Sequence, residues 1–258
     1  MTIKLVIAGC GGRMGARIAS LALNDPAFAL AGAIEATGHH AVGQDLGALL
    51  GNTPLGVQIT HDASQALARG DVLIEFTNPE ATLEHVQVAR QLAKPMVIGT
   101  TGLSDAQREL IRHAAKGIPI VLSPNMSLGV KLLFELAKIA ASRLGTAFDA
   151  TVIEAHHRAK QDAPSGTAKR LAELLAASRG QPPASIPIHA VRAGDIVGDH
   201  TVVFAGPAER LELTHRAHSR DVFAQGALKA AHFVRSQPPG LYDMSHVLVA
   251  LMAEKRIS

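Results

Sequence analysis

One short block of the chain concentrates side chains that move protons and bind anions. Residues 154–168 hold His156, His157, Arg158 and Lys160, followed by a Pro-Ser-Gly-Thr turn. A strand-like run leads into the block and a helix-like run leaves it, so these groups lie on a connection, where binding groups are commonly displayed. The N–H groups at a helix start attract carboxylates and phosphates. The block therefore predicts an anionic substrate, with a histidine and a lysine nearby to transfer its protons.

The adjacent histidines also fit two less specific interpretations. Polar loop surfaces frequently carry such pairs, and that alternative stays open from the pair alone. A metal site fits less well, because neighbouring residues of an extended segment point to opposite faces, and His156 and His157 do not readily chelate one ion. The chain contains no H-E-x-x-H motif and no Cys/His cluster to complete such a site, so we predict no metal.

A glycine-rich turn near the N-terminus indicates which cofactor acts together with the histidine block. Residues 3–8 read as a buried strand, the turn at 9–15 follows, and residues 16–23 are helix-like. Strand, glycine turn and helix form the dinucleotide-binding arrangement, in which glycines let the backbone approach a pyrophosphate. Glu35 ends a second strand about 20 residues after Gly15, the spacing at which an acid binds the adenosine ribose. A glycine turn that binds no nucleotide is the alternative.

The residues around Glu35 bear on the choice of cofactor. A carboxylate at this position repels the 2′-phosphate of NADPH and so favours NADH. Ala36 supplies no cation to offset that repulsion, although Arg13 in the glycine turn is a candidate. We expect the protein to use NADH well, and NADPH less well or comparably.

Length and composition fit a cytoplasmic enzyme of one large or two modest domains. The 258 residues are 47% hydrophobic, which provides an ample core. No apolar run approaches the roughly 20 residues of a membrane span, and the chain opens on a strand rather than a signal peptide. A single cysteine excludes an intrachain disulfide and suits a reducing compartment. We expect no nucleic-acid binding at a net charge of +3, with no Trp and one Tyr.

Strand-like and helix-like runs alternate through the first half of the chain. Strand-like runs recur at residues 57–60, 72–76, 96–99 and 118–122, with helix-like runs at 63–68, 79–93 and 104–115. This alternation predicts a doubly wound parallel sheet, which binds ligands at the carboxyl ends of its strands. Two of those ends, residues 98–102 and 123–127, carry small and hydroxyl side chains. We predict that they contact the nicotinamide half of the cofactor, with ordinary turn chemistry as the alternative.

The pattern changes after the long helix predicted at residues 128–144. Later strand-like runs are joined by Gly and Pro turns, at residues 188–192, 201–205 and 211–216. The last of them alternates apolar and polar residues, as a half-exposed antiparallel strand does, and helices follow at 221–235 and 244–252. We predict an α/β fold with two domains. Residues 1–126 and 236–258 form a Rossmann-like dinucleotide-binding domain, and residues 127–235 form an α+β domain for substrate binding and oligomerisation.

Four motifs, taken in chain order, resemble one enzyme family. They are Gly-Cys-Gly-Gly-Arg-Met-Gly at 9–15, Ile-Gly-Thr-Thr-Gly at 98–102, the histidine block with its turn at 154–167, and Arg-Ala-Gly-Asp-Ile-Val-Gly at 192–198. Together they resemble the 4-hydroxy-tetrahydrodipicolinate reductases, formerly called dihydrodipicolinate reductases, of the diaminopimelate route to lysine. The resemblance spans essentially the whole chain, and the histidine block is highly specific to that family.

The resemblance implies NAD(P)H-dependent reduction of a cyclic dicarboxylate to tetrahydrodipicolinate, with loss of water. It implies that His156 is a proton donor and acceptor and that Lys160 is a proton donor. A substrate carboxylate would be held by His157, Gly166 and Thr167. The implied cofactor contacts are Gly9, Cys10, Gly11, Gly12, Arg13, Met14, Glu35, Gly99, Thr100, Thr101, Ser123, Pro124, Asn125 and Met126. The family also implies a homotetramer built through the second-domain sheet, a tail that returns to the nucleotide domain, and hinged closure over substrate.

Three departures from the family pattern stand out. Ala36 occupies a position where some members carry a basic residue, which bears on NADPH use. Ala159 replaces a third histidine of some members, and residues 179–192 lack a glycine- and arginine-rich loop, which bears on the oligomer interface. Two rival functions remain: another nicotinamide-dependent Rossmann oxidoreductase, for which the histidine block is a coincidence, and a non-catalytic nucleotide sensor or scaffold, which has no use for a proton donor beside an anion pocket.

Overall fold

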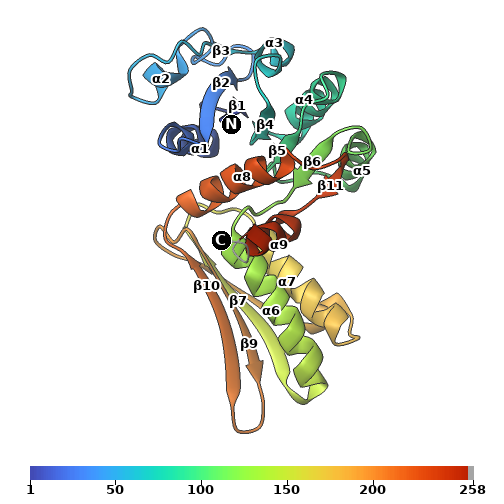
Figure 1. Ribbon diagram of the computed structural model, residues 1–258. Coiled ribbons are helices and arrows are strands. Elements are labelled where there is room, and N and C mark those ends of the chain that lie inside the picture. The colour runs from blue at the N-terminus through green and yellow to red at the C-terminus, as the bar shows by residue number, and fades with distance from the viewer. Residues whose placement is uncertain (255–258) are drawn as a thin grey trace. The chain divides into compact units, whose positions relative to one another are not determined.

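The computed structural model describes residues 1–254 and divides into two compact units (Figure 1). One unit comprises Met1–Met126 together with the chain from Phe223 onward, and the other comprises Ser127–Val222. Within the described residues, no helix combines the length and the apolar character that crossing a membrane requires.

The first unit is built on a seven-stranded parallel sheet. Its strand order is β11-β6-β5-β4-β1-β2-β3. The strands are β1 (Ile3–Ala8), β2 (Phe28–Ile34), β3 (Ile59–Thr60), β4 (Val72–Glu75), β5 (Met96–Ile98), β6 (Pro119–Leu122) and β11 (Gly240–Tyr242). The chain runs from β1 outward through β2 and β3 and then resumes on the other side of β1 with β4, so the strand order reverses between β1 and β4. In a sheet of this kind, ligands bind at the carboxyl ends of the strands beside such a reversal.

Helices cover this sheet and bury its apolar residues. They are α1 (Arg13–Leu23), α2 (Leu46–Leu49), α3 (Ala63–Leu67), α4 (Pro79–Gln91), α5 (Asp105–Ala114), α8 (Asp221–Val234) and α9 (Met244–Glu254). Residues of α3, α4 and α5 form one core with β1, β4, β5 and β6, while α1 packs on β1 and β2. Consecutive residues Leu5, Val6 and Ile7 are all buried, as expected for a strand that is covered on both faces. The predicted doubly wound sheet is therefore confirmed.

Two features of the first unit differ from the expectation. Strand β11 is not predicted, because three residues after a Pro-Pro pair are too few to show a strand period, yet it pairs with β6. Helix α8 joins the first unit from Phe223 onward, whereas the predicted boundary lay after residue 235. The helix packs closely there: a Cβ placed on Gly226 would lie 1.9 Å from the carbonyl oxygen of Met126.

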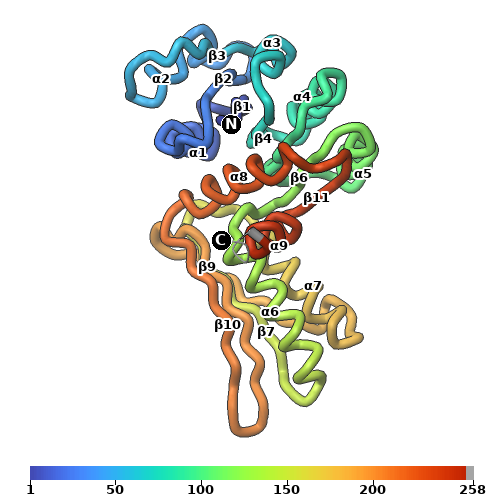
Figure 2. Tube along the Cα trace, in the orientation of Figure 1, coloured from blue at the N-terminus to red at the C-terminus, as the bar shows by residue number. Residues whose placement is uncertain are grey.

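The second unit is a four-stranded mixed sheet with helices on one face. Its order is β10-β9-β7-β8, with β7 and β8 parallel and the other pairs antiparallel. The elements are β7 (Asp149–His156), β8 (Ile188–Arg192), β9 (Gly198–Ala205), β10 (Arg210–Ala217), α6 (Leu128–Leu144), α7 (Gly166–Ser178) and the short 3₁₀ turns η1 (Gly145–Ala147) and η2 (Pro183–Ser185). The tube in Figure 2 follows β9 into β10 through a hairpin turn.

The two faces of this second sheet differ in burial. Alternate residues such as Val152 and Phe204 pack under α6 and α7 in one apolar core. On the opposite face, Ile153 is 40% exposed and Val191 is 45% exposed. The predicted α+β character of this part of the chain is confirmed, and the helices described in this unit cover only one face of its sheet.

Candidate active site

The histidine block begins on the last residues of β7. Glu154 and His156 are two residues apart on this strand, so both side chains point to the face that carries α6 and α7. They are 1% and 8% exposed, and His156 Nδ1 contacts Glu154 Oε2. An ionised carboxylate only accepts hydrogen bonds, so Nδ1 carries a proton and donates it, and the neutral ring keeps its lone pair on Nε2. The carboxylate thereby fixes both the tautomer and the orientation of the ring.

The carboxylate of Glu154 also accepts hydrogen bonds from Arg192 and from the start of α7. Arg192 donates from Nη1 to Oε2 at 2.9 Å and from Nη2 to Oε1 at 2.8 Å, a two-pronged geometry that adds strength and direction. The N–H of Ser165, at the start of α7, donates to Oε1 at 3.1 Å. Arg192 Nη2 further donates to the carbonyl of Asp162 at 2.5 Å, and the Asp162 carboxylate pairs with Lys160 Nζ at 2.7 Å. One buried carboxylate therefore links His156, Lys160 and the start of α7.

The charges around Glu154 set the protonation of the catalytic candidates. Burial lowers the pKa of His156, and the positive charges of Lys160 and Arg192 act in the same direction against the raising effect of Glu154. Burial raises the pKa of Glu154, but hydrogen bonds from Arg192 and His156 outweigh it and hold the pKa below its usual value. The resting arrangement is thus a neutral imidazole beside an ionised carboxylate, with Nε2 ready to accept a proton.

His156 is buried, and Gly198 lies beside the Nε2 side of its ring. A Cβ on Gly198 would lie 3.1 Å from Nε2, so glycine leaves space that a side chain would occupy. His200 stands edge-on to the ring, with 5.1 Å between ring centroids, and its Nε2 bonds Ser165 Oγ at 3.2 Å. Burial, together with the nearby His156, lowers the pKa of His200 to about 3. His200 is therefore a neutral packing partner that adds no positive charge to those of Lys160 and Arg192.

The start of α7 is the part of the candidate site that is suited to an anion. Gly166 and Thr167 are the first two residues of this helix, and Ser165 caps it by accepting the N–H of Ala168 at 3.2 Å. A Cβ on Gly166 would meet no atom within 4 Å, so the helix start faces open space. Backbone N–H groups and the positive end of the helix dipole at such a position attract a carboxylate. His157 follows β7 directly and is half-buried.

The glycine turn of the first unit permits a close backbone approach. Gly9 has a φ of +76°, and a Cβ on Gly15 would lie 2.1 Å from the Gly9 carbonyl oxygen, so α1 packs on the turn only without side chains there. Within the described chain, no side chain caps the start of α1. Cys10 is buried, and burial raises the pKa of its thiol to about 12, so it offers only its backbone. The exposed Arg13 and the half-buried Met14 open α1.

Glu35 lies against this glycine turn. Its Oε2 accepts the N–H of Gly11 at 2.8 Å, and its Oε1 accepts the N–H of Ala36 at 3.0 Å. An uncapped helix start, a turn without side chains and an adjacent carboxylate together match the needs of a pyrophosphate and a ribose. The residues present therefore fit a dinucleotide.

At the carboxyl ends of β5 and β6, some of the predicted cofactor contacts have buried side chains. Thr100 is 4% exposed, and its hydroxyl bonds Thr82 Oγ1 at 2.9 Å and the N–H of Thr77 at 3.2 Å, whereas Thr101 is exposed. A Cβ on Gly99 would overlap the ring of Phe76. Of the residues predicted at this end, Thr101 is the one whose side chain is exposed.

Residues after β6 divide in the same way. Ser123 is buried and donates its hydroxyl to the Asn125 carbonyl at 2.7 Å, and Met126 is also buried. Pro124 is exposed and Asn125 is half-buried. The buried members of this predicted set can reach a ligand only through their backbones.

Comparison with known proteins identifies the family. The family model described as "Dihydrodipicolinate reductase, N-terminus" matches residues 3–126, and that described as "Dihydrodipicolinate reductase, C-terminus" matches residues 129–248. The chain belongs to the dihydrodipicolinate reductase family. The 4-hydroxy-tetrahydrodipicolinate reductase of Syntrophus aciditrophicus is 45% identical over 95% of this chain and 98% of its own. That of Laribacter hongkongensis is 47% identical over 95% and 98%.

Solved structures agree with this assignment. The dipicolinate-bound dihydrodipicolinate reductase from Paenisporosarcina sp. TG-14 has a TM-score of 0.78 at 26% identity, covering 94% of this chain and 98% of that one. An amine dehydrogenase from Mycobacterium smegmatis, with a TM-score of 0.65 at 15% identity, shares the fold alone. The predicted family, the fold class and the interpretation of the chain as a reductase are confirmed.

This member of the family also has a buried ion pair behind Thr100. Glu75 ends β4 with 0% exposure, and its carboxylate contacts His85 Nδ1 on α4 and the hydroxyl of Thr77. Thr82 Oγ1 lies 3.4 Å from the same carboxylate. Burial lowers the pKa of His85, but the hydrogen bond to Glu75 outweighs that effect and the pKa is raised. The pair ties the end of β4 to α4 and, through Thr82, to Thr100.

Replacing Glu75 with glutamine should destabilise the protein strongly. Removing one partner of a buried ion pair costs about 3–5 kcal/mol because the other charge stays buried, and each kcal/mol lowers Tm by about 2–4 °C. Because the folded-state pKa of His85 is raised, its stabilisation is complete below an unfolded pKa of about 6.5 and disappears as pH rises through the folded pKa. Thermal unfolding should therefore show a larger loss in acid than in alkali. Glu109→Gln, in the exposed pair with Arg112, is the control and should change Tm little.

Several site residues were not assigned a role from the sequence. Glu154 has a usable signal, because a residue two positions before His156 on a strand shares its face. Arg192 begins the motif at 192–198, but nothing local pairs it with Glu154, because it reaches that carboxylate from another strand 38 residues away. Glu75 and His85 likewise come together from a strand and a helix, and a glutamate that ends a wholly buried strand is the only local sign of that pair.

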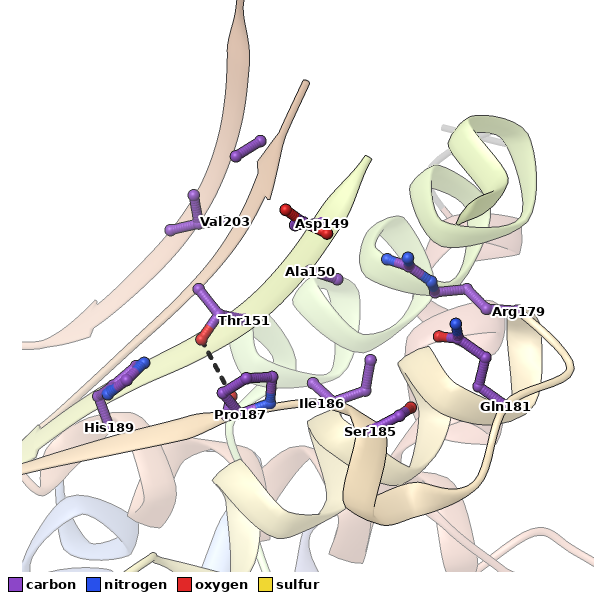
Figure 3. A pocket seen from close by; sticks show the side chains of 11 residues that line it. Asp149, Ala150, Thr151, Arg179, Gln181, Ser185, Ile186, Pro187, His189 and Val203 are labelled. Carbon is purple, nitrogen blue, oxygen red and sulfur yellow. Dashed lines mark hydrogen bonds between the residues drawn. The ribbon is translucent and has the colours of Figure 1, made fainter. Parts of the chain in front are cut away.

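A separate hollow of about 370 Å³ lies at the other end of β7 (Figure 3). It is lined by Asp149, Ala150, Thr151, Arg179, Gln181, Ser185, Ile186, Pro187, His189, Val203 and Ala205. It contains no residue of the histidine block, and Thr151 Oγ1 donates to the Pro187 carbonyl at 3.0 Å along its wall. It is therefore separate from the candidate site around Glu154. Within residues 1–254, no three or more His, Cys, Asp or Glu side chains are grouped to hold a metal ion.

Proposed function

We propose that this chain reduces 4-hydroxy-tetrahydrodipicolinate to tetrahydrodipicolinate with loss of water, in diaminopimelate and lysine biosynthesis. The observation that carries the proposal is the arrangement around Glu154, which holds His156 and links Lys160 to the start of α7. Relatives at about 45% identity have the name of that activity, and a reductase of similar structure is described as binding dipicolinate, a ring with two carboxylates.

Each residue of the arrangement has a chemical task in this reaction. Gly166 and Thr167, with His157, bind a substrate carboxylate at the start of α7. Loss of water takes a proton from the ring and gives one to the departing hydroxyl, and reduction adds a hydride and a proton. The bound reduced nicotinamide supplies the hydride. His156, neutral with its lone pair on Nε2, is suited to accept and return a ring proton, and the Lys160 ammonium is suited to donate one and to stabilise negative charge on the ring.

A coupled assay tests the activity directly. A synthase generates the unstable substrate in place from pyruvate and aspartate semialdehyde, and oxidation of NADH is followed by its near-ultraviolet absorbance. Oxidation should require the synthase and this protein together, and NADPH is tested in parallel. If neither cofactor is oxidised by protein that binds NADH in a fluorescence titration, the assignment of substrate is wrong and another Rossmann oxidoreductase activity takes its place.

The cofactor is proposed to be NADH, with NADPH used less well or comparably. Glu35 stands against the glycine turn where a ribose hydroxyl is bound, and Ala36 beside it brings no positive charge. The pyrophosphate is assigned to the turn of Gly9, Gly11 and Gly12 and to the start of α1.

Replacing Glu35 with alanine should weaken NADH binding about 10- to 100-fold, since a hydrogen bond to a charged group contributes about 1.5–3 kcal/mol. Fluorescence titration of NADH measures this directly. Glu109→Ala, an exposed acid of the same unit, serves as the control. Unchanged affinity in the Glu35 variant would remove Glu35 from the ribose site.

The enzyme is further proposed to be a cytoplasmic homotetramer joined through the second-unit sheet. The face of that sheet opposite α6 and α7 exposes Ile153 and Val191, which favours contact with another apolar surface. The free, buried Cys10 suits a reducing compartment. Light scattering of the purified protein determines the number of subunits.

A further inference from the structure

The 2′ position of the adenosine ribose distinguishes the two nicotinamide cofactors, and this chain lacks a basic residue beside the acid that binds there. Ala36 follows Glu35 and is exposed. A phosphate bound next to a carboxylate needs a donor that offsets the repulsion. The structure contains such a hydrogen-bond donor, the imidazole of His39, in the turn that follows β2.

The imidazole of His39 lies against the same glycine as the Glu35 carboxylate. A Cβ on Gly11 would lie 2.7 Å from His39 Cε1, 3.3 Å from His39 Nε2 and 3.1 Å from Glu35 Oε2. The two side chains therefore converge on the glycine turn from consecutive parts of one loop. Turn hydrogen bonds fix that loop: the N–H of His39 donates to the Ala36 carbonyl at 3.0 Å, and the N–H of Val42 donates to the His39 carbonyl at 3.0 Å.

The hydrogen bonding of His39 directs a donor toward this place. The N–H of Ala41 donates to His39 Nδ1 at 3.2 Å, so Nδ1 holds the lone pair. The proton of the neutral ring is then on Nε2, the nitrogen that lies beside Gly11 and Glu35, and in the charged ring Nε2 is also a donor. In either form His39 presents an N–H donor beside the ribose-binding carboxylate. The neighbouring His40 is more exposed and stacks on His39 with 4.3 Å between ring centroids.

We propose that His39 is a specificity-determining residue that receives the 2′-phosphate of NADPH through Nε2, in place of the basic residue absent at position 36. The proposal rests on the proposed binding of a reduced nicotinamide cofactor at the glycine turn and Glu35. It accounts for how a site with an acid at the ribose admits NADPH beside NADH. NADH, which has a hydroxyl at the 2′ position, keeps its contact with Glu35 and depends little on His39.

Binding measurements on the whole protein, without substrate, test this. NADH and NADPH are titrated by fluorescence, and adenosine 2′,5′-bisphosphate and AMP by calorimetry. The proteins compared are wild type, His39→Ala, His39→Arg, Arg13→Ala and the matched control His40→Ala. His39→Ala should weaken NADPH and the bisphosphate about 10-fold, the size of a lost charge-assisted bond, and leave NADH and AMP within about 2-fold. His39→Arg should bind NADPH at least as well as wild type, and His40→Ala should match wild type for all four ligands.

Three results would overturn the assignment. An unchanged NADPH to NADH affinity ratio in His39→Ala removes His39 from the phosphate site. An equal loss for both cofactors places His39 on the shared adenosine instead. Selective loss of NADPH in Arg13→Ala with none in His39→Ala assigns the phosphate to α1. A wild-type protein that binds neither cofactor contradicts the proposed function itself, which keeps the two failures apart.

Discussion

Replacing Lys160 with alanine should lower kcat about 10²- to 10⁴-fold, the range for loss of a positioned general acid. Lys160 Nζ lies 2.7 Å from the carboxylate of Asp162, and Arg192 donates to the backbone carbonyl of the same residue. Because Arg192 also binds Glu154, the ammonium of Lys160 is connected to the carboxylate that orients His156. NADH affinity should stay unchanged, because the predicted cofactor contacts are on the glycine turn and the ends of β5 and β6. Steady-state kinetics in the coupled assay give kcat, and a fluorescence titration gives the affinity.

The matched control is Lys169→Ala, which removes an exposed lysine from the first turns of α7 and leaves the pair with Asp162 intact. It should retain wild-type turnover. A Lys160 variant that turns over normally would show that its ammonium transfers no proton in the limiting step. A variant with weaker NADH binding and normal turnover would assign Lys160 to the cofactor.

The parts of the fold that sequence predicts well are those with strong local signals. Residues 28–34, 128–144 and 188–192 are a strand, a helix and a strand with the predicted bounds. Proline, glycine or capping residues flank each of these segments in the sequence. The 3₁₀ turns and β11 carry too few residues for any period. No local signal predicts that α8 belongs to the first unit, because an apolar helix could pack in either unit. In the structure, the close packing of Gly226 on Met126 places the helix in the first unit.

The candidate site divides along the same line. The histidine block and the glycine turn are each one continuous stretch of sequence, so their chemistry can be predicted from the sequence. The hydrogen bonds from Arg192 and Ser165 to Glu154 form because two strands and a helix meet in space. Such long-range hydrogen bonds produce no pattern in the sequence from which they could be predicted. Burial also changes the meaning of predicted residues: Thr100 was expected to face the cofactor, yet its hydroxyl bonds Thr82 inside the unit.

The position of Glu154 explains why the block requires a carboxylate on β7. His156 alone would rotate and exchange tautomers, and its Nε2 would not face one direction. Arg192 compensates the negative charge of Glu154 and has its own pKa raised by the bond it makes to that carboxylate, so the pair stays ionised inside the protein. The cost of burying these charges is offset by the satisfied oxygens of Glu154.

Replacing Glu154 with glutamine should lower kcat about 10²- to 10⁴-fold, as loss of an orienting acid beside a catalytic imidazole does elsewhere. Arg192 has donors only, so the amide oxygen of the new side chain must turn toward it and the NH₂ group then faces His156. An NH₂ group donates to Nδ1 and moves the ring proton to Nε2, which is the wrong tautomer for accepting a proton. NADH affinity should not change.

Stability should fall in the same variant, because Arg192 and the N–H of Ser165 lose a charged partner inside the protein, at a cost of about 3–5 kcal/mol. The matched control is Glu173→Gln on α7, whose pair with Arg170 is half-exposed and should contribute no more than about 1 kcal/mol. Denaturant unfolding and the coupled assay separate the two effects: loss of stability with normal kcat would make Glu154 purely structural. Loss of kcat in protein that is still folded at the assay temperature supports its role in holding the tautomer of His156, because a fold-maintaining residue alone leaves the turnover of the folded fraction unchanged.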